Sequence, residues 1–273
     1  MTLAVIVIAG ALIGLSLGAL GGGGSILTVP VLVYSLGQSA AQATAGSLVV
    51  VGITALAAAV TAYRAGKVLL TRGLAFGAVA VGGAAAGARA SVLVSGPVLL
   101  TAFAALLLAV AGVMAARQLR PRRGRPGQHA ESAIGDPIIT FSPSFACQCP
   151  RALKVLVTAT VVGLLTGFLG VGGGFLVVPA LVLALGLPMG YAVGTSLVVI
   201  AITSASALAV RAGAGIHPSW GVVALLTAVA VTGAWAGARL TARTDTSKLQ
   251  AAFTVLLLLV AGYTAWRALP GLT

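Results

Sequence analysis

Charged side chains are scarce in this sequence, and negatively charged ones are almost absent. Asp, Glu, Lys and Arg together make up 7% of the 273 residues, whereas soluble domains carry about 25%. Hydrophobic residues make up 59%, and they occur in runs of roughly 18 or more, the length that crosses about 30 Å of hydrocarbon. The composition therefore excludes a water-soluble enzyme and predicts an integral membrane protein in a lipid bilayer.

The three acidic residues, Glu131, Asp136 and Asp245, all lie outside the apolar runs. A pathway for metal cations or a carboxylate proton relay normally places Asp or Glu inside the membrane, so both are disfavoured. An intramembrane protease would need two such Asp residues or a Ser and His pair, and neither pattern occurs. The net charge of +13 sits beside the apolar runs, as orientation signals do, so we expect no nucleic-acid partner.

Cysteine is also scarce. Cys147 and Cys149 are too few and too close for a disulfide framework. Together with His129 they form an incomplete set of metal ligands. His217 has no acidic or cysteine partner nearby in the sequence. We therefore expect no metal site, no cofactor and no catalytic residues.

The sequence does contain an internal duplication with an offset of 149 residues. Outside the linker it aligns glycines, a proline and a block of hydroxyl and aliphatic residues: Gly14, Gly18, Gly21, Gly23, Gly24, Pro30, Leu36, Gly37, Ser47, Leu48, Val49, Val50, Ile53 and Thr54 match Gly163, Gly167, Gly170, Gly172, Gly173, Pro179, Leu185, Gly186, Ser196, Leu197, Val198, Val199, Ile202 and Thr203. With small gaps, Arg64 also pairs with Arg211, and Arg89 with Arg239. Such repeats are typical of secondary transporters.

The duplication predicts an all-α membrane protein of about eight transmembrane segments, built as two homologous four-segment repeats over residues 1–118 and 151–273. Residues 119–150 between them are rich in Pro, Gly and Arg and are interpreted as a cytoplasmic linker. The apolar segments are 3–36, 43–62, 71–90 and 97–118 in the first repeat, and 152–185, 193–210, 219–240 and 249–268 in the second.

Two topologies fit this pattern. If every segment crosses once, the N-terminus and the linker lie on the same, cytoplasmic side, with Arg64 and Arg211 inside and Arg89 and Arg239 outside. If the first segment of each repeat instead folds back as a re-entrant hairpin, each half crosses three times and the repeats are inverted. The charge distribution places the basic linker in the cytoplasm in both cases, which indicates a multi-pass protein of the inner membrane.

The first segment of each repeat is longer than one crossing requires and is interrupted by a glycine run, at residues 21–24 and 170–174. Each glycine costs about 1 kcal/mol relative to Ala in a helix interior, so the sequence predicts a break. A break inside the membrane exposes backbone NH groups, which need a partner, and the helix that restarts after it directs partial positive charge at the gap. An anion can be that partner. The spacing of Gly14 from Gly18, by contrast, is typical of helix packing.

Small hydroxyl side chains begin the span that follows each break, where they can cap the helix or donate to an oxyanion. The candidate substrate-binding residues are therefore Gly21, Gly22, Gly23, Gly24, Ser25, Thr44, Ser47, Gly170, Gly172, Gly173, Gly174, Thr195 and Ser196. The arginine pairs could attract an anion to the mouths of a pathway, but an interfacial role is the usual one for basic residues at segment ends.

The pattern Gly163-x-x-x-Gly167-x-x-Gly170-x-Gly172-Gly173-Gly174, followed by Pro179 and by Gly194-Thr195-Ser196-Leu197, resembles the sulfite exporter TauE/SafE family of membrane permeases. The resemblance implies transport of sulfite, of sulfonates such as sulfoacetate, or of related sulfur-containing anions. We expect an alternating-access exporter with a site between the repeats; an anion channel and a non-transporting scaffold are the alternatives. The sequence also allows a homodimer.

Overall fold

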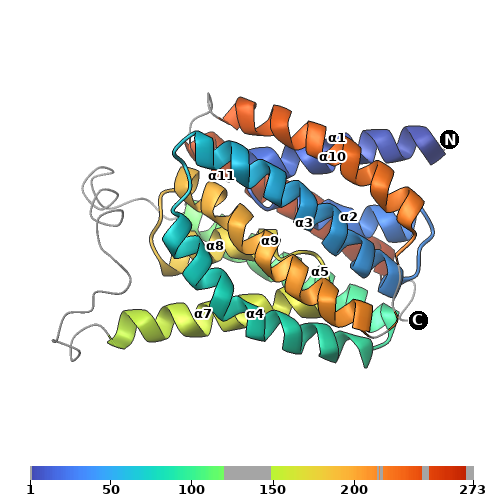
Figure 1. The fold of residues 1–273 in the computed structure, drawn as a ribbon, viewed down its shortest axis with the longest axis horizontal. Coiled ribbons are helices and arrows are strands. Elements are labelled where there is room, and N and C mark those ends of the chain that lie inside the picture. Colours follow the sequence, from blue (N-terminus) through green and yellow to red (C-terminus); the bar gives the residue numbers. More distant parts are fainter. Residues whose placement is uncertain (1, 120–148, 214, 216–217, 242–245, 269–273) are drawn as a thin grey trace.

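The computed structural model describes residues 2–119, 149–213, 215, 218–241 and 246–268, and in these ranges the chain is helical without a strand (Figure 1). Most of the predicted linker, including Cys147, lies outside the described residues. The elements are α1 Thr2–Leu20, α2 Gly23–Pro30, the π-helical turn η1 Val31–Ser35, α3 Ala40–Arg64, α4 Leu70–Val92, α5 Gly96–Leu119, α7 Cys149–Leu169, α8 Gly174–Ala184, α9 Met189–Gly213, α10 Trp220–Thr241 and α11 Thr246–Ala268.

Six of the described helices, α1, α3, α4, α5, α9 and α10, are long and apolar enough to cross a membrane. Three shorter apolar helical stretches accompany them: Gly23–Ser35, Leu153–Leu169 and Ala251–Tyr263. The all-helical membrane class is confirmed. The predicted number of eight crossing segments is not confirmed, because α7 and α11 contribute only shorter apolar stretches to the described residues.

The first long segment breaks where its glycines begin, and α2 then folds back along α1. Gly24 lies against Ile13 and Leu17 of α1, and Leu32 of η1 shares a buried cluster with Ile6 and Ile13. The reversal needs a left-handed backbone at Gly21, with φ of 70°, a conformation that glycine adopts without steric cost. The break predicted from the glycine run is confirmed.

The second long segment breaks in the same way between α7 and α8. Gly170 has a φ of 64°, equivalent to Gly21 in the first half, and Gly173 lies against the side chain of Thr166 one turn before the end of α7. Each half of the chain therefore starts with a helical hairpin, the shape of the re-entrant alternative, although α1 is itself long and apolar enough to cross a membrane.

The hairpins change which ends of the helices lie together. Because α2 and η1 run back along α1, α3 begins at the end of the molecule where α1 begins, and α5 finishes at the opposite end (Figure 1). The start of α1 and the point where the chain leaves α5 for the linker are thus at opposite ends. The expectation from single crossings, which placed them on one side, is wrong because the hairpin adds a reversal of direction.

Helices from different halves form the closest pairs. Gly14 and Gly18 of α1 lie against Ala230 and Ala234 of α10, and Gly163 and Gly167 of α7 lie against Ala80 and Ala84 of α4. In each pair the residue numbers increase together, so the helices are parallel. A Cβ on any of these glycines would collide with a backbone carbonyl of the partner, so the packing interpretation of this spacing is confirmed.

The central pair is α3 and α9, which are antiparallel. Thr44 near the start of α3 meets Arg211 near the end of α9, and Gly52 meets Ser204. Both helices are more buried than the outer spans. The two hairpins lie beside this pair, so α3 and α9 form the scaffold that holds both glycine breaks.

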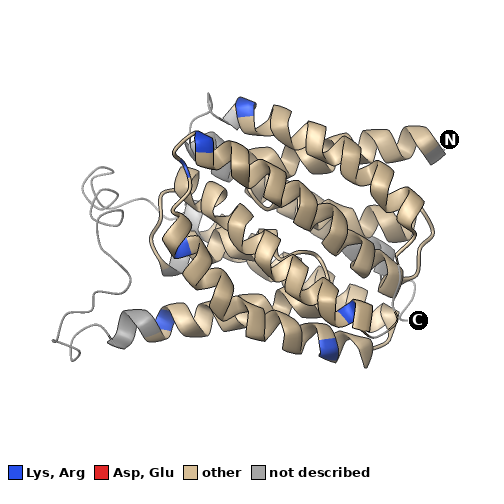
Figure 2. Ribbon diagram, viewed as in Figure 1, with Lys and Arg blue, Asp and Glu red and all other residues tan. Residues whose placement is uncertain are grey.

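Basic residues lie at the ends of the helices (Figure 2). The end at which α3 stops and α4 and α7 start carries Arg64, Lys67, Arg72 and Lys154 of the described residues, together with Arg239 because α10 runs parallel to α1. We call this the linker end. The far end carries Arg89 and Arg211. The single-crossing expectation had placed Arg239 beside Arg89, and the hairpins again explain the difference.

Candidate functional site

The two glycine breaks meet inside the bundle. A Cβ on Gly22 would collide with the carbonyl of Gly174, and a Cβ on Gly174 would lie 2.7 Å from the Cα of Gly22. All residues of both runs, 21–24 and 170–174, are buried. The glycines that the sequence places 149 residues apart are thus in direct backbone contact, which only residues without side chains allow.

Each short helix starts at this meeting point without a side-chain cap. The N-cap residues are Gly22 for α2 and Gly173 for α8, and neither N-cap residue makes a side-chain capping hydrogen bond. The first amides of a helix have no partner within the helix, and its N-terminus carries about half a positive charge. Two such termini therefore direct partial positive charge into one buried region.

Most of the predicted hydroxyl groups hold the backbone around this region. Ser25 donates to the Gly22 carbonyl at 2.7 Å. Ser196 shares its one hydroxyl proton between the carbonyls of Gly21 at 3.1 Å and Val193 at 2.8 Å. Thr195 accepts a hydrogen bond of 3.1 Å from the Leu69 amide. These three side chains hold the first break and the chain before α4. Their hydroxyl protons are therefore already engaged, or lie away from the N-terminal ends of α2 and α8, which we call the tips.

Other buried hydroxyls have no partner. Ser47 and Thr54 of α3 and Ser204 of α9 are fully buried, and their oxygens make no hydrogen bond within the described part of the chain. The Ser204 oxygen lies 3.1 Å from the position of a Cβ on Gly172. A buried polar group without a partner is costly, which makes these hydroxyls candidates for binding a ligand beside the second break.

The sequence predicted only Ser47 among these three unpaired hydroxyls. Thr54 carried a usable signal, because it matches Thr203 in the duplicated block. Ser204 carried none, since the equivalent residue of the first half is Ala55.

Arg211 is the only fully buried charged residue in the described part of the chain, with 1% of its surface exposed. Its guanidinium donates to Thr44 Oγ1 at 2.9 Å and to the carbonyls of Gly167 at 3.1 Å and Phe168 at 3.3 Å, in the last turn of α7. Its Nε has no partner among the described residues. The interfacial role expected for Arg211 is therefore wrong, whereas Arg64 in the first half is exposed.

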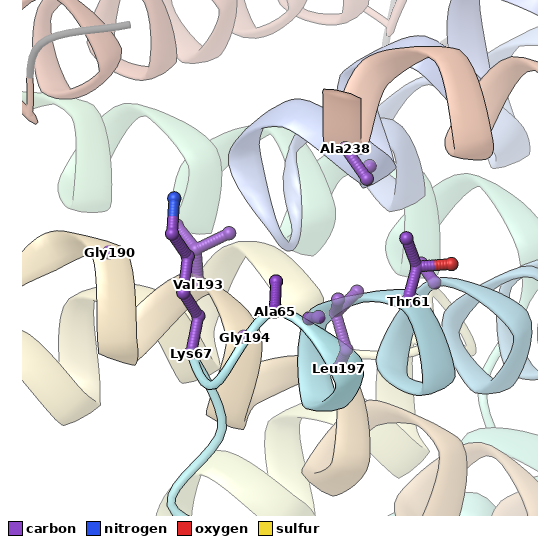
Figure 3. A pocket seen from close by; sticks show the side chains of 11 residues that line it. Thr61, Ala65, Lys67, Gly190, Val193, Gly194, Leu197 and Ala238 are labelled. Carbon is purple, nitrogen blue, oxygen red and sulfur yellow. The ribbon is translucent and has the colours of Figure 1, made fainter. Parts of the chain in front are cut away.

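A cavity of about 60 Å³ lies beside the first break, toward the linker end. Its wall is formed by the last turn of α1, the end of α3, the start of α9 and Ala238 of α10, with Lys67 at the side (Figure 3). Val193 lines this cavity and also touches Gly21. The cavity thus reaches the residues that hold the first glycine break.

No group of three or more His, Cys, Asp or Glu that could hold a metal occurs in the described ranges. Cys147 and His129 lie outside them, and the three acidic residues do so as well. The polar groups that the structure places around the breaks are backbone amides, hydroxyls and one buried guanidinium. Donors of this kind bind anions.

Comparison with known proteins shows which family the chain belongs to. Two proteins from two strains of Xylella fastidiosa, each called a probable membrane transporter protein, are 31% and 32% identical to this chain; each match covers 95% of this chain and 93% of the relative. No solved structure matches the chain. The profile of the sulfite exporter TauE/SafE family matches residues 6–264, so the resemblance seen in the glycine motifs is confirmed and the chain belongs to this family of membrane transporters.

Proposed function

We propose that this protein is a secondary transporter that exports a small sulfur-containing oxyanion, such as sulfite or an organosulfonate like sulfoacetate. The observation that carries the proposal is the contact of Gly22 with Gly174, where two uncapped helix N-termini meet in the buried centre of the bundle. The family supplies the class of substrate.

The proposed site combines the tips with the hydroxyls beside them. The amides of residues 22–24 and 172–174 and the unpaired hydroxyls of Ser47, Thr54 and Ser204 would donate to the oxygens of the anion. Donors aimed at one point stabilise an oxyanion without needing a formal charge. The described residues contain no carboxylate that would repel it.

The proposed mechanism is alternating access between inverted repeats. This mechanism is supported by the packing of the first span of each half against a helix of the other half: α1 packs on α10, and α7 packs on α4. In addition, α3 packs antiparallel to α9, its equivalent in the second half. A rotation axis in the membrane plane relates helices in this way. Inverted repeats that carry broken helices at their interface are a recurrent architecture of secondary transporters.

Export is the favoured direction because the membrane potential drives it. An inside-negative potential of 100 mV gives about 2.3 kcal/mol per elementary charge to an anion that leaves the cell. A coupling cation is therefore not needed, in keeping with the absence of acidic residues from the described spans.

Flux of sulfite into proteoliposomes containing the purified full-length protein tests the proposal. We expect saturable uptake, counterflow from preloaded sulfite, and dependence on the imposed potential. Uptake that rises linearly with concentration and lacks counterflow would indicate a channel. No uptake of sulfite, sulfoacetate, thiosulfate or sulfate would indicate a non-transporting scaffold, and a requirement for a proton or sodium gradient would contradict potential-driven export.

A further inference from the structure

The two ends of the α3 and α9 pair are filled differently, although the duplication makes them equivalent. At the far end the Arg211 guanidinium lies between the last turn of α7 and Thr44, and beside it Leu48, Ala88 and Ala207 pack into a buried cluster. The equivalent residues at the linker end are Leu197, Ala238 and Ala58, and all three line the cavity instead.

One substitution between the halves accounts for the difference. The first-half break touches Val193 at the position where the second-half break touches Thr44. Valine has no oxygen to accept a hydrogen bond from a guanidinium, and Arg64, the equivalent of Arg211, is exposed. The cavity is thus the empty counterpart of the place that Arg211 occupies.

We propose that this cavity is the access site through which the substrate anion reaches the first glycine break from the linker end, with Lys67 as its charged residue, and that Arg211 keeps the equivalent place at the far end closed. The inference rests on the proposed transport of an oxyanion. It adds that the linker end is open to the anion through Lys67 and that the far end is closed by Arg211.

The size and charge of the cavity fit such a role. A volume of about 60 Å³ holds several waters or one small oxyanion. Lys67 is half-buried at its side, and the described residues contain no acid that would neutralise it. A basic residue at the mouth of a passage with apolar walls raises the local concentration of anions.

Neutralising Lys67 tests the charged residue. In proteoliposomes with sorted orientation, Lys67→Gln should raise the KM for sulfite presented at the linker end about threefold to fivefold, the range of a partly exposed charge contact. The KM for sulfite presented at the far end should stay unchanged. An equal change at both ends, or no change at either end while flux is preserved, would overturn the inference; absence of sulfite flux in the unaltered protein would instead contradict the proposed function.

Thiol labelling tests the open and closed ends without relying on transport. Ala58→Cys and Ala207→Cys are equivalent positions, each 1% exposed or less, and both are made in a Cys147→Ser, Cys149→Ser background. With 2-sulfonatoethyl methanethiosulfonate as the probe, Ala58→Cys should react from the linker end at least tenfold faster than Ala207→Cys reacts from the far end. Equal rates would overturn the inference, as would faster reaction at position 207.

Thr44→Val tests the closing role of Arg211 because it copies Val193 of the first half. Combined with Ala207→Cys, it should speed labelling from the far end at least tenfold, while leaving labelling of Ala58→Cys from the linker end within twofold. Unchanged protection at position 207, in protein that elutes as the parent does on size exclusion, would show that Arg211 does not close this end.

Discussion

At the scale of single residues, Gly22 and Gly174 are held by each other's backbones, so neither can accept a methyl group without separation of the two tips. We expect Gly22→Ala to lower the stability by about 1–3 kcal/mol, as overpacking of a buried contact does, and to abolish sulfite flux. The measurements are the thermal midpoint in detergent and uptake by proteoliposomes.

The matched control is Gly82→Ala, in the interior of α4. A Cβ there meets nothing within 4 Å, and alanine has the higher helix propensity. The thermal midpoint should stay or rise, and flux should be unchanged. If Gly22→Ala behaved in the same way, the tip contact would have no role in the fold or in transport.

Substitutions of Ser47 and of its equivalent Ser196 are expected to differ in their effects on sulfite binding and on stability. The one hydroxyl proton of Ser196 is shared between two backbone carbonyls, whereas the Ser47 oxygen is buried without a partner. Ser47→Ala should therefore weaken sulfite binding about tenfold or more, the effect of one hydrogen bond to a charged group, and leave the thermal midpoint equal or higher.

Ser196→Ala should lower the thermal midpoint because it removes the brace on Gly21. Calorimetric titration with sulfite and a thermal melt of each variant distinguish the two roles. A drop in stability for Ser47→Ala, with unchanged affinity for sulfite, would remove Ser47 from the proposed site.

Sequence reasoning identified residues that lie at the breaks, but it could not tell which of them were already engaged. Ser47 and Ser196 are the same residue type at equivalent positions, and only the contact of Ser196 with Gly21 distinguishes them. The burial of Arg211 was likewise hidden, because it depends on Thr44, a residue 167 positions away.

At the scale of elements, the parallel pairs α1 with α10 and α7 with α4 depend on glycine at their contacts. We expect Gly14→Ala and Gly163→Ala each to lower stability by about 1–3 kcal/mol, because the new Cβ would collide with Ala230 or Ala80 of the partner helix. Thermal melts in detergent would show this.

Gly112→Ala in α5 is the control for these helix pairs, since a Cβ there meets nothing within 4 Å. Its thermal midpoint should equal or exceed that of the parent. Equal melting of all three variants would mean that the close approach of the paired helices contributes nothing to stability.

The break in each first segment was predictable because a run of glycines is costly in a helix. Its geometry was not predictable. Whether α2 continues in the direction of α1 or returns along it depends on the contact of Gly24 with Ile13 and Leu17, and neither composition nor charge distinguishes the two paths. Compared with single crossings, the return of α2 reverses the directions of α3, α4, α5 and α7 relative to α1, and the second break reverses the chain again before α9.

At the scale of the whole molecule, the hairpins place the start of α1 and the linker at opposite ends (Figure 1). Arg64, Lys67, Arg72, Lys154 and Arg239 lie at the linker end, and Arg89 and Arg211 lie at the far end. From the positive-inside rule we expect the linker to lie in the cytoplasm. We expect reporters fused at the N-terminus and inserted within residues 120–148 to lie on opposite faces of the membrane.

Alkaline phosphatase and green fluorescent protein fusions in intact cells measure this topology. Fluorescence should come from the linker insertion and phosphatase activity from the N-terminal fusion when it carries its own export signal. Both reporters on one face would contradict the hairpin arrangement and restore the topology of single crossings.

The exchange of partners between the halves has a consequence for how the protein is put together. Since α1 is packed by α10 and α7 by α4, neither half contains the helix that covers its own first span. A chain severed between residues 120 and 148 should stay associated as two fragments, and either fragment made alone should be degraded. The covalent connection would then ensure that the two oppositely inserted halves are made in equal number. The packing of the paired helices at their glycines would be sufficient to hold the halves together.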